Sequence, residues 1–448
     1  RQIVIRANEA LVELMPCWMM SPLAVASYLP KDKIQFDLVI IDEASQMTPE
    51  NAVGAIARAK QVMVVGDTNQ LPPSNFFRKI LGEEDDDEDL AVPEESILEL
   101  ANRAFHPKKY LRWHYRSRHE SLIAFSNKHV YENRLVIFPS AGEIQENTGV
   151  SLVKVEGYYK GGINQIEAKE LISAISDFMR QHPDRSLGVV TINAKQKALV
   201  EELLDYETLT KDHIIKYVNK WKSDQSGLNE FFIKNLENVQ GDERDVIFIS
   251  TVHGPPEKGA KVRQNFGPIT GINGKRRLNV LFTRARFQIK TFTSMTSSDI
   301  TAHSLKQPGS WMLKKWLEYS VTGIIESGED LNLEPESPFE EHVIELIKSF
   351  GFEPVPQVGV GGFRIDIGIR HPRWPHGYIM GIECDGATYH SSRSARDRDR
   401  LREEILTGLG WHIYRIWSTD WFQDTKKEAN LMKDAILKRI ATLTSSNN

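Results

Sequence analysis

The sequence predicts a mixed α/β protein in which helices flank parallel sheets. The first observation is a set of short apolar runs typical of buried strands, at residues 38–41, 62–65, 187–192 and 246–250. The second is a set of apolar residues at helical spacing: Ile166, Leu171, Ile172, Ile175, Phe178 and Met179, then Leu199, Leu203 and Leu204. The third is the alternation of both patterns from residue 37 to about residue 292, which is typical of strand–helix–strand units.

The patterns divide the chain into four segments. We expect a first α/β domain at 1–108, a second at 109–300, a helical linker at 301–336 and a compact α/β domain at 337–448. In the last segment an amphipathic helix that contains Phe339, Val343 and Ile344 precedes the strands. These strands are expected near 363–369, 378–384 and 412–417.

Composition limits the class of protein. The 448 residues are 40% hydrophobic and 26% charged, as in globular proteins of two or three domains. No apolar stretch approaches the roughly 20 residues of a membrane span, so we expect no membrane association. Two cysteines are too few for a disulfide framework, and we expect a cytoplasmic location. The net charge of −5 gives no global nucleic-acid footprint, although large nucleic-acid motors can bind through local basic surface.

Two carboxylates stand directly after the first strand run. Asp42 and Glu43 follow residues 38–41, which places them at the carboxyl edge of the sheet, where ligands of such sheets bind. An Asp there can hold Mg²⁺, and a neighbouring Glu can orient or activate an attacking water. The second strand run leads into residues 66–73, which include Gln70 and two stiffening prolines.

Six segments resemble, in order, the motifs of superfamily 1 helicases of the nonsense-decay branch. They are residues 42–46, 66–73, 111–117, 188–193, 238–245 and 276–286. The resemblance implies two RecA-like domains that use ATP. It also implies roles for residues: Arg116 and Arg284 would reach the γ-phosphate, Gln70 would sense it, and Gly241 and Glu243 would contribute to the nucleotide site.

The phosphate-binding loop that such a motor needs is not found in this sequence. The nearest candidate, Gly274-Lys275, has Ile269 where the first glycine belongs and Arg276 where the hydroxyl belongs. In the helicase family this loop precedes the segment around Asp42. We therefore expect an incomplete first RecA-like domain, negligible ATP hydrolysis by this chain alone, and completion by a missing N-terminal part of the same polypeptide.

The C-terminal segment carries a second group of acidic residues. Asp366 lies in one expected strand, and Glu383 and Asp385 close the next. Carboxylates on adjacent strands can converge on Mg²⁺, which polarises a phosphodiester and generates hydroxide. His390 could act as the general base, and Glu340 or Glu341 could add a ligand.

Residues 337–425 resemble the PD-(D/E)xK nuclease superfamily, and specifically the very-short-patch-repair (Vsr-like) endonucleases. Residues 386–390 correspond to the Gly-x-x-x-His turn of that group. The usual lysine position holds Asp385, which weakens a lysine-assisted mechanism and favours one that uses His390. The alternatives are a turn role for Asp366, a structural role for His390 and an ordinary exposed charge for Glu341.

Residues 391–402 combine arginines and aspartates on an expected helix. The arginines could contact phosphates beside the metal site, or they could pair with the aspartates on a solvated helix.

Together these patterns predict the C-terminal part of a DNA helicase-nuclease. It would use ATP to translocate on or unwind DNA, single- or double-stranded, and Mg²⁺ to cut it, in bacterial defence or DNA processing by resemblance alone. One alternative is a non-catalytic nucleic-acid-binding or assembly module with a degenerate nuclease, which Asp385 supports. A second alternative is that only the motor is active and that the last domain acts as a DNA clamp.

Overall fold

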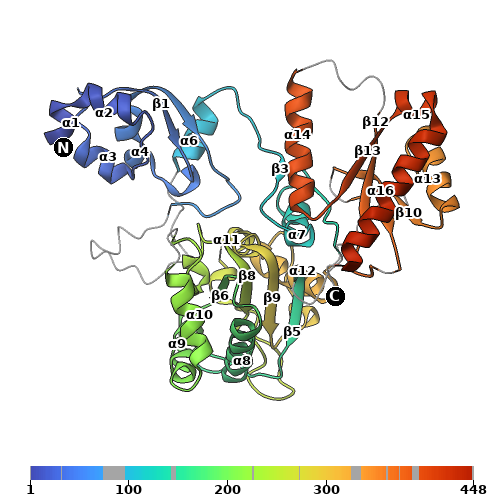
Figure 1. Ribbon diagram of the computed structural model, residues 1–448. Helices are drawn as coiled ribbons and strands as arrows, with labels where there is room; N and C mark the ends of the chain where they lie inside the picture. The colour runs from blue at the N-terminus through green and yellow to red at the C-terminus, as the bar shows by residue number, and fades with distance from the viewer. Residues whose placement is uncertain are drawn as a thin grey trace. The chain divides into compact units, whose positions relative to one another are not determined.

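The computed structural model describes most of the chain (Figure 1). The described residues are 2–31, 33–73, 96–142, 148–223, 227–271, 273–323, 334–359, 362–372, 374–385 and 393–445. Contacts divide the chain into unit 1, Arg1–Tyr110 with Gly271–Val280, and unit 2, Leu111–Thr270 with Leu281–Asn448. Both units combine helices with sheets, so the predicted α/β class is confirmed. Within the described ranges no helix is long and apolar enough to cross a membrane.

Unit 1 is built on a two-stranded parallel sheet. Its elements are α1 (Gln2–Arg6), α2 (Asn8–Leu14), α3 (Pro22–Tyr28), β1 (Phe36–Ile41), η1 (Ala44–Gln46), α4 (Pro49–Ile56), β2 (Ala59–Val64) and α6 (Ile97–Ala104). The strands pair in register from Phe36↔Ala59 to Ile41↔Val64. Its small core contains Ile41, Ala44, Ala52, Ile97 and Leu98.

One face of this sheet carries exposed apolar side chains. Leu38 is 43% exposed, Ile40 59% and Met63 51%, and Ile40 pairs with Met63 across the two strands. Parallel sheets normally bury both faces under helices. The described part of unit 1 therefore leaves apolar surface uncovered on β1 and β2.

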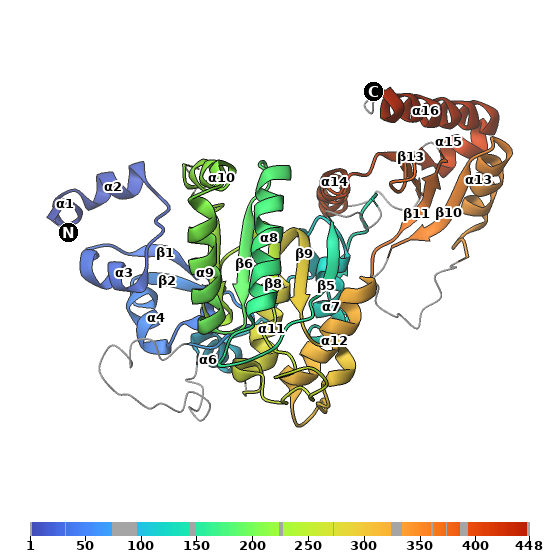
Figure 2. The same cartoon turned by 90° about the horizontal axis from the view of Figure 1, so that it is seen from below.

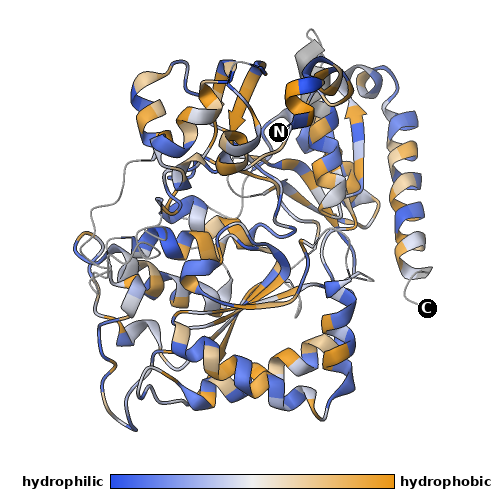
Figure 3. Ribbon diagram, turned by 90° about the vertical axis from the view of Figure 1, so that its left-hand side faces the viewer, coloured by the Kyte–Doolittle hydropathy of each residue, from blue (hydrophilic) through white to orange (hydrophobic). Residues whose placement is uncertain are grey.

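Unit 2 contains a five-stranded parallel sheet in the order β5-β9-β8-β6-β7. The strands are β5 (Gly149–Lys154), β6 (Leu187–Thr191), β7 (Phe232–Asn235), β8 (Arg244–Ser250) and β9 (Ala285–Thr293). Hydrophobic residues run along these strands (Figure 3). Every residue of β6 is buried, which explains why the sequence pattern of this strand is continuously apolar and not alternating.

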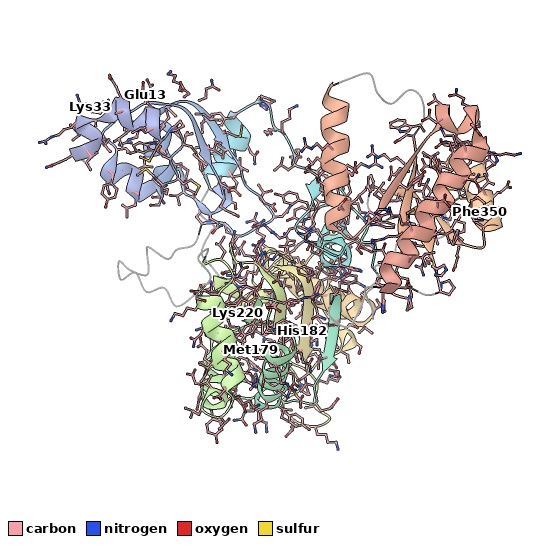
Figure 4. All side chains as sticks on the ribbon, in the orientation of Figure 1. Glu13, Lys33, Met179, His182, Lys220 and Phe350 are labelled. Atoms are coloured by element: carbon pink, nitrogen blue, oxygen red, sulfur yellow. The ribbon has the colours of Figure 1, made fainter. Side chains whose placement is uncertain are left out.

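Helices cover the sheet of unit 2. Helices α8 (Gln165–Gln181), α9 (Ala194–Thr208) and α10 (Asp212–Lys222) pack against one another (Figure 2), and Met179 of α8 belongs to the main core (Figure 4). Helices α7 (Ser121–His129) and α12 (Pro308–Thr322) contact β5. The indole of Trp316 stacks on the ring of Phe282 at 3.7 Å between centroids. The Trp-rich part of the expected linker thus packs into unit 2, while residues 324–333 lie outside the described ranges.

The remaining described elements between residues 111 and 300 are short. They are β3 (Trp113–His114), β4 (Val136–Ile137), η2 (Leu236–Asn238), η3 (Gly267–Ile269), α11 (Gly274–Phe282) and η4 (Ser297–Asp299). Strands β3 and β4 form a two-stranded parallel pair.

The C-terminal domain of unit 2 has a mixed four-stranded sheet in the order β10-β11-β12-β13. Its elements are α13 (Pro338–Ser349), β10 (Glu353–Val358), β11 (Ile365–Arg370), β12 (Met380–Asp385), α14 (Arg393–Gly408), β13 (Ile413–Trp417), α15 (Ser418–Gln423) and α16 (Thr425–Ser445). The first three strands pair antiparallel, and β13 runs parallel to β12. The expected strands are confirmed, and β10 is an addition. Its prolines, Pro354 and Pro356, suit the edge position that it occupies.

Candidate functional sites

The carboxylates of unit 1 lie at the carboxyl end of β1. Asp42 directly follows this strand, and the backbone N–H of Glu43 donates to Oδ1 of Asp42 at 2.9 Å. Glu43 has a φ of +51°, a left-handed conformation that is uncommon for a residue with a side chain. Gln46 Nε2 donates to Glu43 Oε2 at 3.1 Å. Both carboxylates are exposed, so they occupy the sheet edge that the sequence predicts for them, while their chemical roles stay predictions.

Gln70 lies in the turn after β2. Its side-chain Nε2 donates to Asp67 Oδ2 at 3.2 Å, and the backbone N–H of Asn69 donates to Asp67 Oδ1 at 2.8 Å. Gln70 Oε1 is buried and has no hydrogen-bond partner among the described residues. A buried polar atom without a partner is costly. This oxygen can therefore accept a hydrogen bond from a donor that the described residues do not supply.

Arg116 and Glu243 form an ion pair in unit 2. Nε of Arg116 lies 2.7 Å from Oε2 of Glu243. Arg286 approaches the same carboxylate at 3.9 Å and pairs with Asp245 at 3.0 Å. Two residues that the sequence assigns to one nucleotide site, from distant segments, are therefore in direct contact.

His114 shapes the turn that carries Arg116. Its Nε2 accepts from the backbone N–H of Ser117 at 3.2 Å and lies 2.8 Å from the Ser117 hydroxyl. Burial, and then the positive charge of Arg116, lowers the pKa of His114 to about 4. The imidazole is therefore neutral at physiological pH and acts as a hydrogen-bond acceptor within this turn.

Arg284 and Gly241 have different local settings. The side chain of Arg284 is buried, and its backbone carbonyl accepts from the N–H of Arg244 at 3.1 Å. Gly241 has a φ of +85° in the turn before β8, where glycine avoids the strain of a side chain. The structure thus gives the local environment of Arg284 and the backbone reason for Gly241. Their contributions to a nucleotide site stay predictions.

A buried carboxyl group at the carboxyl edge of the five-stranded sheet is not among the residues that the sequence pointed to. Glu167 of α8 accepts from the Ser250 hydroxyl at 2.6 Å, from the N–H of Val252 at 2.7 Å and from the Ser294 hydroxyl at 3.2 Å. Burial raises its pKa to about 7. Glu167 thus fixes the loops after β8 and β9. Its place on the apolar face of α8, four residues before Leu171, is the signal that could have revealed it.

The C-terminal domain brings Asp366 and Glu383 together. Ile367 of β11 pairs with Ile382 of β12, so the neighbouring Asp366 and Glu383 stand opposite each other on the same face of the antiparallel pair. Oδ2 of Asp366 accepts from the N–H of Cys384 at 2.7 Å. This juxtaposition is the one that the sequence predicts for these two carboxylates.

Burial and crowding of negative charge act on both groups. Burial, and then the charges of Glu340 and Asp385, raises the pKa of Asp366 to about 6, against the effects of the Cys384 hydrogen bond and Arg402. Burial, with Asp366 and Asp385, raises the pKa of Glu383 to about 7, while Arg402 and Arg415 lower it. Both carboxyls are therefore poorly compensated by the residues that surround them.

Arg402 of α14 compensates part of this charge. Its Nη2 lies 2.6 Å from Oε2 of Glu383, and its guanidinium stacks over the Phe363 ring at 4.2 Å. The sequence predicts Arg402 on an arginine-rich helix and does not pair it with Glu383. The available signal was Asp385, which leaves the usual lysine position of the site without a cation.

Glu340 and Glu341 lie in different environments. Glu340 is buried, and its carboxylate accepts from the Ser337 hydroxyl at 2.8 Å and from Gln357 Nε2 at 2.9 Å. Glu341 is exposed. Glu340 is thus the one that acts electrostatically on Asp366, with its own oxygens engaged in hydrogen bonds. His390 and the expected turn at 386–390 lie outside the described residues.

The donor set suits a hard divalent cation only in part. Glu383 Oε1 and Asp385 Oδ2 are buried and lack a hydrogen-bond partner among the described residues, and carboxylate oxygens are the ligands that Mg²⁺ prefers. In the same described ranges, no group of three or more His, Cys, Asp and Glu side chains is arranged to hold a metal. The unpartnered oxygens of Glu383 and Asp385 can therefore bind a cation. The described residues do not supply a complete set of metal ligands.

Comparison with known proteins adds independent findings. Residues 23–76 and 93–295 each match a family model described as an AAA domain, and residues 339–436 match the family model REase_MTES_1575. The chain is 28% identical over 438 residues to the "Uncharacterized ATP-dependent helicase MG140 homolog" of Mycoplasma pneumoniae, which covers 93% of this chain and 38% of that protein. It is 27% identical over 282 residues to the "ATP-dependent helicase upf1" of Schizosaccharomyces pombe, which covers 57% of this chain and 26% of that protein.

A structural similarity is also found. The helicase of PRRSV matches with a TM-score of 0.26 and 14% identity over 57% of this chain and 34% of that one, which is too low to establish a shared overall fold. The chain contains AAA segments similar to those of ATP-dependent helicases, followed by a restriction-endonuclease-like domain. The helicase resemblance and the broad nuclease resemblance are thereby confirmed. The Vsr-like assignment stays a prediction.

Proposed function

We propose that this chain belongs to an ATP-dependent helicase that also cleaves DNA with Mg²⁺, in bacterial defence or DNA processing. The observation that carries the nuclease part is the pair of buried, undercompensated carboxyls at Asp366 and Glu383 on adjacent strands. Such residues cost stability in the folded protein, and a bound cation would remove that cost.

In the proposed nuclease site, Asp366, Glu383 and Asp385 would hold Mg²⁺. When bound, Mg²⁺ would polarise a phosphodiester and lower the pKa of a water ligand. Asp366 is positioned by the N–H of Cys384, and Glu383 keeps one oxygen unpartnered among the described residues. His390 would accept the proton of the attacking water, a role that rests on the resemblance to Vsr-like enzymes.

In the proposed helicase site, Arg116 and Arg284 would stabilise charge on the γ-phosphate of ATP, and Gln70 would sense that phosphate. Asp42 would hold a second Mg²⁺, and Glu43 would orient the attacking water. The Arg116–Glu243 ion pair supports this proposal because it keeps a mobile guanidinium in one place before nucleotide binds.

We further propose that another part of a longer polypeptide completes unit 1 and supplies the phosphate-binding loop. The exposed apolar face of β1 and β2, with Leu38, Ile40 and Met63, supports this proposal because a parallel sheet is stable when both faces are covered. The chain spans only 38% of the length of the Mycoplasma pneumoniae relative, which leaves room for such a part.

A DNA nicking assay with Mg²⁺ or Mn²⁺ tests the nuclease. We expect the wild-type chain to nick supercoiled DNA and the Asp366→Ala variant to lose at least about 100-fold in rate, a typical effect for a group that positions the reacting centre. Asp434→Asn removes an exposed carboxylate of α16 and serves as the matched control. Equal rates for wild type and Asp366→Ala would refute the assignment.

A second candidate function is a non-catalytic nucleic-acid-binding module with a degenerate nuclease. Two observations favour it: Asp385 stands in the usual lysine position, and Arg402 occupies one oxygen of Glu383. Absence of cleavage by wild type and Asp366→Ala across several metals, combined with retained DNA binding in both, would support this alternative.

A further inference from the structure

The restriction-endonuclease-like domain is docked on a defined part of the helicase-like region. A hydrophobic core joins residues of 113–142, here called the docking segment, to residues of the C-terminal domain. Its buried members are Phe138, Ala141, Val358, Ile365, Leu406, Leu409 and Trp411. Such a shared core indicates that the two regions move together and are not merely tethered.

Directed hydrogen bonds fix this docking. The indole Nε1 of Trp411 donates to the carbonyl of Pro139 at 2.8 Å, and the N–H of Tyr378 donates to the carbonyl of Ala141 at 2.8 Å. Gly377 has a φ of +133°, and a side-chain carbon at this position would overlap the Ala141 carbonyl. The contact therefore has one register, set by backbone atoms as well as by apolar packing.

Helix α14 reaches from this docking contact to the nuclease-like site. At its C-terminal end the carbonyl of Gly408 accepts from Nη1 of Arg118 at 2.9 Å. Six residues earlier, Arg402 holds Oε2 of Glu383 at 2.6 Å. The N–H of Arg118 donates to the carbonyl of Arg286 at 2.7 Å, so the helix end is tied to the backbone beside the Arg116–Glu243 pair.

We propose that the helicase-like region controls the nuclease-like site through α14, with Arg118 and Arg402 as positioning residues. Arg118 anchors the end of the helix, and the anchored helix keeps Arg402 on Glu383, where its charge competes with a divalent cation. A shift of the segment that carries Arg116 moves α14 and frees both oxygens of Glu383. This inference rests on the proposed metal-dependent nuclease and adds its regulation.

Calorimetric titration of the chain with Mn²⁺ tests this coupling without relying on activity. An Asp366→Asn variant identifies the part of the binding that belongs to this site. We expect Arg402→Gln to bind Mn²⁺ there about tenfold more tightly, which corresponds to about 1.4 kcal/mol of removed repulsion. Arg402→Lys keeps the charge and should bind with near wild-type affinity.

Arg118→Ala is the decisive variant because it lies outside the metal site. We expect it to bind Mn²⁺ at least about threefold more tightly than wild type, and its α14 amides at 404–408 to exchange hydrogen faster. Arg180→Ala, which removes an exposed arginine of α8 paired with Asp177, and Lys438→Gln on α16, an exposed position, are the matched controls. Both should leave affinity and exchange unchanged.

The outcomes separate the two proposals. Wild-type Mn²⁺ affinity in Arg118→Ala, or in Arg402→Gln, overturns the coupling while the metal site stands. If wild type and Asp366→Asn bind Mn²⁺ equally, or if neither binds it, the metal-dependent nuclease itself is refuted. The control by α14 is then refuted with it.

Discussion

The crowded carboxyls of the C-terminal domain should make it less stable when they ionise. The clearest perturbation is Asp366→Asn, which removes one charge, while the amide oxygen can still accept from the N–H of Cys384. The pKa of Asp366 is about 6 in the folded protein, compared with 3.8 in the unfolded chain. A carboxyl group with this difference costs about 3 kcal/mol of folding free energy once it is fully ionised, and partial exposure makes this an upper value.

The sign of the pH dependence follows from the raised pKa. Below about pH 3 the carboxyl is protonated in both states and carries no penalty. As the pH rises from about 3 to about 6, the unfolded chain releases its proton first, so wild type loses stability. We therefore expect Asp366→Asn to exceed wild type by about 2–3 kcal/mol in folding free energy at pH 8 and to match it at about pH 3, where other groups contribute equally to both proteins.

Native-state hydrogen exchange of the β11 and β12 amides measures this local stability in the intact chain. If Mg²⁺ binds here, its addition at pH 8 should stabilise wild type and leave Asp366→Asn unaffected, which would narrow the difference. A variant that is equally stable or less stable than wild type at pH 8 would refute the electrostatic reasoning. Asp434→Asn should show no effect at either pH.

The other predictions concern docking, backbone geometry and ATP. Trp411→Ala should destabilise the C-terminal domain by about 3–5 kcal/mol in urea unfolding, whereas Trp411→Phe, which loses mainly the bond to Pro139, should cost about 1–2 kcal/mol; equal losses would contradict the packing argument. Gly377→Ala should weaken the docking and raise the protease sensitivity of the Ala141 region, an effect that an unchanged digestion pattern would exclude. The chain alone should hydrolyse ATP negligibly in a phosphate-release assay with Mg²⁺ and DNA, and rapid turnover would disprove its dependence on an additional phosphate-binding loop.

The sequence predicts much of this fold because the buried strands have a strong local signal. Strand β6 is apolar throughout, since both of its faces are covered, and the Asp366–Glu383 pair follows from two adjacent strand patterns. The sequence pattern does not predict strand β10, because Pro354 and Pro356 are compatible with a strand only at a sheet edge.

The contacts that could not be predicted are those between distant segments. Arg402 reaches Glu383 from α14, and the C-terminal end of this helix is held by Arg118, a residue from the first part of unit 2. Glu167 is engaged by hydroxyl and backbone donors from two different strand ends. Periodicity reports which face of an element is buried, and it carries no information about which remote group meets that face.

The prolines of β10 also limit which strands can pair with this edge of the sheet. Pro354 and Pro356 pair with Ile369 and Ile367 of β11, so these two positions are the ones at which backbone N–H groups of β10 would point outward, away from β11. Proline has no N–H to offer there. A second copy of the chain, or a stray extended peptide, would meet an edge without donors at alternate positions, and the sheet is protected from edge-to-edge growth on this side.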